Sequence, residues 1–301
     1  MRPHKWLHRY AQFTAAFTLF LLVAGGLVTS TDSGLAVPDW PLSYGTWMPP
    51  MVGGIFYEHG HRMIAGVTGI LIFILAGLLW VADKRPWVKR LGLAAVVGVI
   101  AQALLGGLTV ILLLPPQVSI AHACLGQTVF CLVTCLAFAT ADGWEQEGSP
   151  IDDTGSPSVR TLALTYAVCA AFQLFLGAML RHTGMPVLVH VAGAAITAAF
   201  GAWVIRRVLR TRPQLTALRR HARRSEHLIG TQIILGIAAW VWRGNPAITT
   251  AHVVVGALLL AQAVVLAWQA CRLTAQNRSV GRALSAKDTF RAPLSEPAHA
   301  A

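Results

Sequence analysis

The hydrophobic positions of this chain come in long uninterrupted runs, whereas the helices of a soluble protein alternate apolar and polar faces every three or four residues. A helix of about 20 apolar residues is long enough to span a bilayer. Eight such runs occur, at residues 13–31, 60–82, 91–114, 119–140, 162–180, 187–205, 227–242 and 250–270. The pattern predicts an all-α integral membrane protein with eight transmembrane helices, of which the seventh is the shortest.

Composition agrees with this class, because 55% of the 301 residues are hydrophobic and only 12% are charged. The basic residues also orient the helices. If both termini are cytoplasmic, 21 of the 24 lysines and arginines lie inside, as the positive-inside rule requires, and only Arg62, Arg181 and Arg243 lie outside. Topology and anionic headgroups then account for the net charge of +12, so no nucleic acid partner is expected.

One pattern occurs three times along the chain: a helix with glutamine and, four positions later, glycine, then a short loop with proline, then a helix with histidine near its start. The glutamine and glycine pairs are Gln102 and Gly106, Gln173 and Gly177, and Gln232 and Gly236, and the histidines are His122, His190 and His252. Gly25, Gly26 and His61 form a looser copy with a much longer loop.

The spacing of the histidines indicates an internal duplication. His61 and His122 are 61 residues apart, and His190 and His252 are 62 apart. We therefore predict two pseudo-symmetric four-helix bundles related by an axis along the membrane normal. The predicted parts are an N-terminal half, a cytoplasmic linker, a C-terminal half and a disordered cytoplasmic tail, at residues 1–141, 142–160, 161–272 and 273–301.

Four histidines at one membrane depth indicate ligation, since an ionisable side chain near the bilayer centre costs roughly 2.5 to 3.5 kcal/mol and tends to mark function. Zinc is disfavoured, because no second His, Cys or carboxylate lies one helical turn from His122, His190 or His252. Two imidazoles from facing helices suit the axial positions of a haem, so each half is expected to hold one haem. The alternative is that these histidines are hydrogen-bond partners between helices.

The segment EHGHR at residues 58–62 offers two histidines, and the spacing does not choose between them. His59 and His61 point in nearly opposite directions on a helix. A small residue follows each repeated histidine by four positions, and Ala65 follows His61 in this way, whereas Met63 follows His59. The repeat therefore favours His61 as the ligand.

Glu58 lies one turn before His61 on the same helix face. The residues three positions before the other histidines are Ser119, Val187 and Thr249, so only the first half has an acid–base group at this place. This asymmetry predicts chemistry in the first half and electron storage or a structural role in the second. The alternative is that Glu58 only pairs with Arg62 at i, i+4 spacing.

The three outer arginines, Arg62, Arg181 and Arg243, flank the histidine-bearing helix ends, where a guanidinium can bind haem propionates. For Arg243, interfacial snorkelling is an equally good explanation. The segment TSTDSGLAVPDWP at residues 29–41 fits a folded lid with Asp39 and Trp40 as its main contacts, or a loop packed for its own stability.

The sequence resembles the heme A synthase family over nearly all of its length up to about residue 272. The most specific part runs from GGLVTSTDSGLAVPDWPLSYG through EHGHR, residues 25–62. The resemblance departs from the pattern at Val37 and Ser43, where many members have a cysteine pair, so this chain is similar to the type that lacks it. A relay of electrons through a loop disulfide is not expected here.

The resemblance implies an enzyme that oxidises the C8 methyl group of haem O to a formyl group, giving haem A for terminal oxidases, by two hydroxylations followed by loss of water. It implies His61 and His122 as ligands of the substrate haem, Glu58 as the essential acidic residue, and His190 and His252 as ligands of a haem b cofactor. It also implies the bacterial cytoplasmic membrane, with the haem sites toward the outer face.

Partners implied by the resemblance are haem O, a haem O synthase and assembly factors of terminal oxidases, while membrane lipid follows from the fold, and a homo-oligomer is left open. Two other functions use the same sequence features. A non-catalytic dihaem b-type cytochrome would use the four histidines without needing Glu58. A transporter would use the doubled halves, but the midplane helix breaks expected of one are missing from the sequence.

Overall fold

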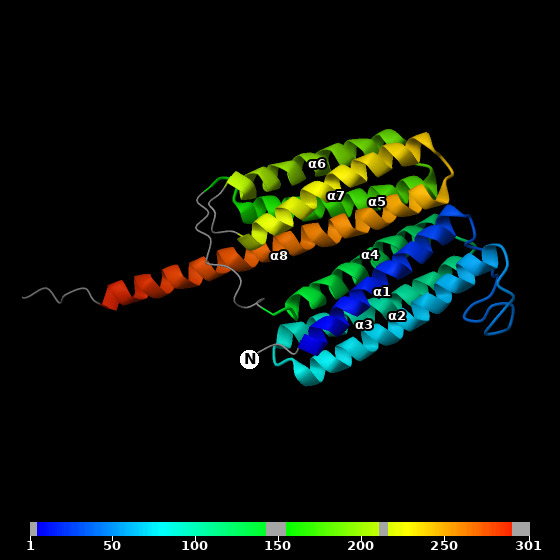
Figure 1. Ribbon diagram of the computed structural model, residues 1–301, viewed down its shortest axis with the longest axis horizontal. Coiled ribbons are helices and arrows are strands. Elements are labelled where there is room, and N and C mark those ends of the chain that lie inside the picture. The colour runs from blue at the N-terminus through cyan, green and yellow to red at the C-terminus, as the bar shows by residue number, and fades with distance from the viewer. Residues whose placement is uncertain (1–4, 143–154, 211–215, 291–301) are drawn as a thin grey trace, which may run out of the picture.

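In the computed structural model, the described residues form eight helices. These helices are arranged in two bundles (Figure 1). The structure describes residues 5–142, 155–210 and 216–290. The helices are α1 Lys5–Ser30, α2 Gly54–Ala82, α3 Pro86–Ile111, α4 Pro116–Ala139, α5 Val159–Thr183, α6 Val187–Arg210, α7 Thr216–Val241 and α8 Pro246–Phe290. The all-helical class and the count of eight predicted from the apolar runs are confirmed for these residues.

Local signals in the sequence explain where several helices begin and end. Proline stands in the first turn of α3 and α4, where its missing N–H costs nothing. The side chain of Ser158 accepts a hydrogen bond from the Thr161 N–H at 3.1 Å and caps α5. Gly184, with φ of +68°, ends α5 in the left-handed conformation that glycine adopts without strain. These signals therefore set where α3, α4 and α5 begin and where α5 ends.

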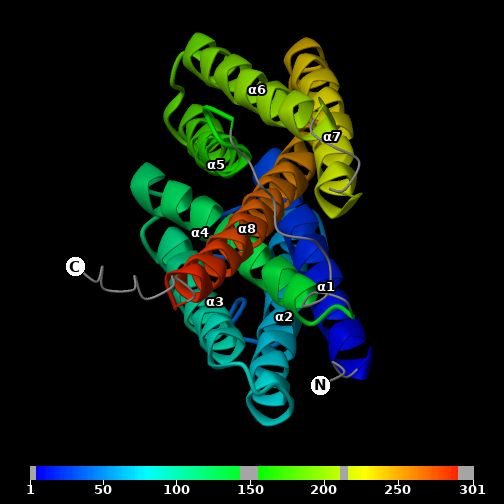
Figure 2. The same ribbon diagram turned by 90° about the vertical axis from the view of Figure 1, so that its left-hand side faces the viewer.

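Helices α1–α4 form one bundle and α5–α8 the other, and in each bundle the first helix packs on the fourth to close the ring. Helix α4 also contacts α5 and α8, and α1 contacts α8, which joins the two bundles. Figure 2 shows α4 and α8 where the two bundles meet. Half of the apolar window of each of these two helices is buried, against 17–28% in the other five membrane-crossing candidates. Helices α4 and α8 therefore lie at the interface between the two pseudo-symmetric bundles.

Seven helices are long and apolar enough to cross a membrane, by length and composition. The helix outside this group is α7, whose first half contains Arg219, Arg220, Arg223 and Arg224. It nevertheless runs beside α6 and α8 along the second bundle and contacts both (Figure 1). The apolar run predicted at 227–242 is thus the second half of a longer helix that starts at Thr216.

The chain after residue 272, expected to be a disordered tail, continues as part of α8 to Phe290, and residues 291–301 lie outside the described ranges. Residues 273–290 contain Ala, Arg, Leu and Gln, which favour helix once a preceding helix has nucleated it. Of the predicted linker, residues 143–154 also lie outside the described ranges.

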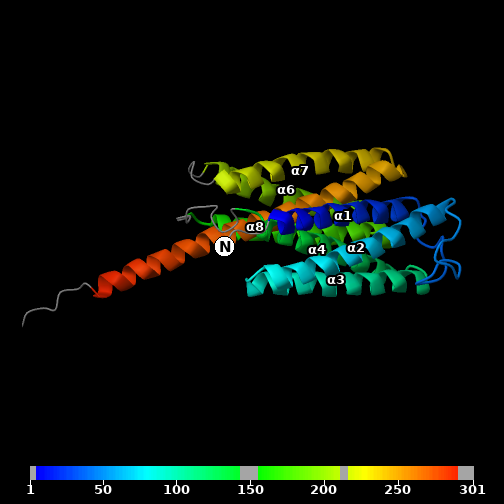
Figure 3. The same cartoon turned by 60° about the horizontal axis from the view of Figure 1, so that its bottom comes forward.

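The loop at residues 31–53 connects α1 to α2 and projects past the helix ends (Figure 3). The other connections at this end are short, since α3 and α4 are joined by residues 112–115 and α5 and α6 by residues 184–186. We call this end, where the even-numbered helices begin, the histidine end. The long loop therefore covers the histidine end of the first bundle alone.

Close helix packing in the second bundle depends on Gly201 of α6. A Cβ atom at this position would lie 2.6 Å from a methyl carbon of Ile229 and 2.8 Å from the ring of Tyr166, whose side chain is fully buried. By contrast, a Cβ atom at Gly66 of α2 would meet nothing within 4 Å. The two glycines therefore form a matched pair for a test of packing.

We expect Gly201→Leu to destabilise the protein by about 1 to 3 kcal/mol, because overpacking forces neighbouring side chains off their rotamers. Gly66→Leu should leave stability nearly unchanged. The measurement is the thermal unfolding midpoint of each purified variant in the same detergent. Equal midpoints for the two variants would show that α6 does not pack closely on α5 and α7.

Candidate functional site

Each of the four repeated histidines packs against a glycine of the preceding helix. A Cβ atom added at Gly25 or Gly106 would lie 3.0 Å from Cε1 of His61 or His122, respectively. The corresponding distances are 3.3 Å from Gly177 to His190 and 3.2 Å from Gly236 to His252. The first hairpin thus has the same close approach as the other three, although its loop is longer, and it is His61 that takes part in it.

The glutamines of the repeat contact the same histidines. The Nε2 of Gln102 donates to the His122 carbonyl at 3.0 Å, and that of Gln173 donates to the His190 carbonyl at 2.9 Å. Gln232 Nε2 lies 3.3 Å from Nε2 of His252. In the first hairpin the position four residues before Gly25 is Leu21, so His61 has no such partner there. Three histidines are therefore positioned by an amide and a glycine, and His61 by a glycine.

His190 and His252 face each other across the second bundle. Helices α6 and α8 each pack on α5 and α7, and their two imidazole rings meet with centroids 6.4 Å apart at an angle of 69°. A metal atom about 2 Å from one nitrogen of each ring would separate the centroids by roughly 6 Å. The pair thus fits two axial ligands of one iron. Helices α2 and α4 have the same relation to α1 and α3 in the first bundle.

The donor set also fits haem better than a protein-only metal centre. Within the described ranges, no three His, Cys, Asp or Glu side chains are grouped so that they could hold a metal ion. The Nδ1 atoms of His61, His122 and His252 are buried and have no hydrogen-bond partner among the described residues. A buried polar nitrogen without a partner is costly unless a ligand or water engages the ring.

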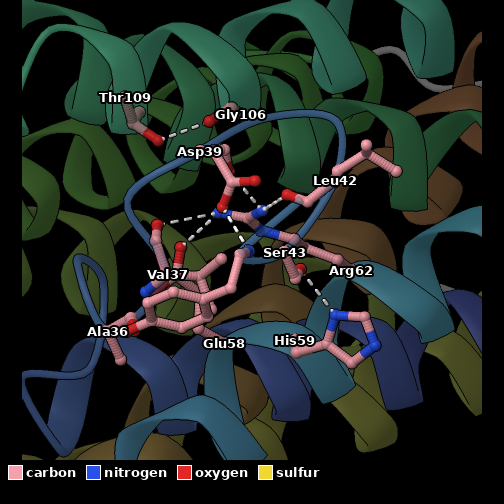
Figure 4. Close-up of polar contacts among 11 residues, drawn as sticks. Ala36, Val37, Asp39, Leu42, Ser43, Glu58, His59, Arg62, Gly106 and Thr109 are labelled. Atoms are coloured by element: carbon pink, nitrogen blue, oxygen red, sulfur yellow. Dashed lines mark hydrogen bonds and ion pairs between the residues drawn. The ribbon is translucent and has the colours of Figure 1, made fainter. Parts of the chain in front are cut away.

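Glu58 is buried at the start of α2, with 3% of its surface exposed. Its Oε2 accepts the backbone N–H of Val37 at 2.8 Å, and its Oε1 accepts Nη2 of Arg62 at 2.6 Å (Figure 4). The ion pair with Arg62 that the spacing offered as an alternative role is therefore present. Both oxygens of the carboxylate therefore accept a hydrogen bond, one from the loop and one from Arg62.

Arg62 binds the loop as well as Glu58. Its Nη1 donates to the carbonyls of Asp39 at 2.6 Å and Leu42 at 2.9 Å, and its Nη2 donates to that of Val37 at 3.2 Å (Figure 4). Of the two contacts predicted for this arginine, propionate or lid, the structure contains the lid contact. Arg62 thus fixes residues 37–42 over the start of α2.

His59 points away from the repeated histidines, as the helical spacing predicts. Its Nδ1 lies 2.7 Å from the hydroxyl of Ser43 in the loop, and its side chain is buried (Figure 4). His59 therefore belongs to the contacts between α2 and the loop. Three residues of α2 thus bind the loop: Glu58 binds Val37, His59 binds Ser43, and Arg62 binds Val37, Asp39 and Leu42. We call this set of contacts the loop clasp.

Asp39 and Trp40, the predicted lid contacts, have different partners. The Asp39 carboxylate accepts the N–H groups of Gly45 at 2.8 Å and Tyr44 at 2.7 Å, and these hydrogen bonds hold its pKa below the usual range. The ring of Trp40 packs on α3, where a Cβ atom at Gly107 would lie 2.7 Å from it. Asp39 thus shapes the loop and Trp40 attaches it to α3.

The other two outer arginines do not share one role. Arg181, at the end of α5, donates to the Asp32 carboxylate at 2.8 Å and to the Thr29 carbonyl, so it ties the second bundle to the start of the loop. Arg243 stacks on Trp240, 3.5 Å above the ring centroid. No local pattern pointed to Asp32, because its partner lies 149 residues away.

Part of the chain matches known proteins. The family model described as "Cytochrome oxidase assembly protein", COX15-CtaA, matches residues 51–187. A heme A synthase of Alkalihalophilus pseudofirmus is 32% identical over 187 residues, which cover 60% of this chain and 61% of that relative.

Other relatives agree. A heme A synthase of Symbiobacterium thermophilum is 32% identical over 189 residues, 60% of each chain, and one of Bacillus pumilus is 30% identical over 203 residues, 64% of this chain and 65% of the relative. The matched stretch spans about three fifths of these relatives' length. By these matches the chain is similar to the heme A synthase family, COX15-CtaA, over part of its length.

Proposed function

We propose that this protein is a heme A synthase that oxidises the C8 methyl group of haem O to a formyl group and so produces haem A for terminal oxidases. The observation that carries the proposal is the asymmetry between two otherwise equivalent halves. Each half has two histidines packed on glycines, but only the first has a buried carboxylate and a loop bound to it. The reaction class that we propose for this arrangement is taken from the name of the relatives, heme A synthase.

In this proposal, His61 and His122 bind the substrate haem O in the first bundle. The glycine contact of His61, shared with the other three histidines, supports His61 over His59. Gly126, one turn after His122, makes room for Gln102, whose Nε2 would lie 3.0 Å from a Cβ atom added there. His59 would then act on the loop and not on iron.

His190 and His252 would hold haem b as the cofactor of the second bundle, which their ring separation of 6.4 Å supports. When bound, this haem supplies a one-electron carrier for the oxidation. Gln173 and Gln232 fix the two histidines by contacts to the carbonyl of His190 and the ring of His252. Such contacts hold a ligand's ring orientation, which sets the properties of the metal it binds.

Glu58 would be the acid–base residue. Oxidation of a methyl group removes protons as well as electrons and so requires a proton acceptor, and Glu58 is a buried carboxylate held in place by Arg62 and Val37. Because Oε2 binds the loop and Oε1 binds Arg62, which also holds the loop, a shift of the loop clasp would release one of the two oxygens for the substrate edge. The proposed chemistry is thus tied to the position of residues 37–42.

The proposed setting is the bacterial cytoplasmic membrane, with both termini cytoplasmic and the histidine end toward the outer face, which the distribution of basic residues supports. A haem O synthase that delivers the substrate and oxidase assembly factors that receive the product are the partners this function would require.

The choice of His61 is tested by haem extraction from protein purified out of membranes that make haem O. We expect wild type to contain haem B together with haem O or haem A, and His61→Ala to retain only haem B, because it lacks a ligand of the substrate haem. The readout is chromatography of the extracted haems with mass detection.

The control is His59→Ala, which should keep both haem types, since His59 binds Ser43 and not the repeat. Loss of the substrate haem in His59→Ala but not in His61→Ala would reverse the assignment. Haem B alone, at about two per wild-type chain, would instead identify the protein as an electron-transfer cytochrome.

The role of Glu58 is tested with Glu58→Gln, which keeps the shape of the side chain but removes its charge. We expect both haem sites to fill and the formation of haem A to fall by about 10² to 10⁴, the usual contribution of a general base. The measurement is the ratio of haem A to haem O in extracts and in a timed assay.

Two variants separate chemistry from structure. Glu226→Gln, an exposed change on α7, should have full activity. Arg62→Gln removes the loop contacts but leaves the carboxylate, and should reduce activity less than Glu58→Gln. Full activity in Glu58→Gln would contradict the acid–base role, and equal losses in Glu58→Gln and Arg62→Gln would reduce Glu58 to a loop anchor.

A further inference from the structure

A cavity of about 340 Å³ lies between α4, α7 and α8, on the side of the molecule away from the histidine end. Its walls include Phe130 and Thr134 of α4, Arg224 and His227 of α7, and Leu258 and Gln262 of α8. Cavities that bind small ligands start at about 300 Å³. This cavity takes no part in the proposed haem chemistry, because none of the four repeated histidines lines it.

The three helices are fixed to one another beside this cavity. The ring of His221 on α7 packs against Phe138 of α4, with centroids 5.1 Å apart. Gln262 of α8 donates through Nε2 to the His221 carbonyl at 3.3 Å, and the same atom lies 2.8 Å from Nδ1 of His221. The cavity is therefore a preformed feature at the junction of the two bundles.

The lining of the cavity contains one arginine, Arg224, and most of its other side chains are apolar. Arg224 and His227 are exposed and lie on one face of α7, three residues apart. No carboxylate lines the cavity, and residues 116–139 of α4 and 246–273 of α8 contain none at all. Apolar residues such as Phe130 and Leu258 also line the cavity.

We propose that this cavity is a binding site for one anionic phospholipid. Arg224 would bind the headgroup phosphate through charge-assisted hydrogen bonds, with His227 beside it, and an acyl chain would lie against Phe130 and Leu258. A basic pocket between membrane helices is the kind of site that selects anionic headgroups. Bound there, the lipid bridges α4 of the first bundle and α7 and α8 of the second. The proposal does not depend on the haem chemistry.

The test is native mass spectrometry of the purified full chain in detergent, titrated separately with phosphatidylglycerol and phosphatidylcholine. We expect one phosphatidylglycerol to bind at least tenfold more tightly than phosphatidylcholine. Arg224→Gln should weaken this first binding event about tenfold, the effect of losing a hydrogen bond to a charged group.

Arg223→Gln is the matched control, because Arg223 is equally exposed, loses the same charge and lies on the same helix, but is turned about 100° away from the cavity. It should bind phosphatidylglycerol as wild type does. Equal weakening by both variants would reduce the site to general attraction between a basic helix and anionic lipid. Equal affinity for the two lipids in wild type would also overturn the proposal. Elution volume in size-exclusion chromatography shows whether each variant is folded.

Discussion

The close approach of a histidine ring to a glycine is the contact on which the arrangement of the helices depends. It occurs once in each of the four helix hairpins, at Cβ distances between 3.0 and 3.3 Å. A side chain at any of these glycines would force the ring to shift from this position. Glycine lets the two helices pack closely and leaves the ring in one orientation, which a planar ligand between two such rings requires.

Both bundles have the same contacts between histidines and glycines, and they differ in the segments that close the histidine end. In the second bundle short hairpins close the histidine end, and amides of Gln173 and Gln232 engage the histidines. In the first, the hairpin between α1 and α2 is replaced by residues 31–53, bound through the loop clasp. A site that keeps its ligand needs only the former arrangement, whereas a site that exchanges substrate for product needs a cover that can move.

The positions Val37 and Ser43 show how this loop is held. The resemblance to the family placed a cysteine pair of many members at these two positions. Here the N–H of Val37 binds Glu58 and the hydroxyl of Ser43 binds His59, and the five cysteines of the chain are all free and lie outside the loop. Hydrogen bonds to two adjacent residues of α2, together with Arg62, therefore fix the loop without a covalent link.

Periodicity and repeats in the sequence predicted the eight helices, the pairing of halves and the contrast between His59 and His61. They depend on residues near one another in the chain, where helix geometry fixes relative direction. The start of α7 was missed because an apolar run reports the lipid-facing part of a helix, and the arginines before residue 227 are helical without being apolar. The partners of Arg181 and of the Gln262 amide join residues far apart in sequence, and no local pattern encodes such pairs.

The joint between the bundles connects the two pairs of repeated histidines mechanically as well. Thr250, two residues before His252, contacts the hydroxyl of Ser30 at 3.2 Å and lies against Gly26, and Arg181 binds Asp32. The residues that begin the loop over the first site are thus attached to the helix that carries a histidine of the second. A displacement of α8 at His252 would be passed to the loop through Ser30, because packed helices move as rigid bodies. The two halves therefore behave as one unit at the histidine end, although each bundle buries its own core.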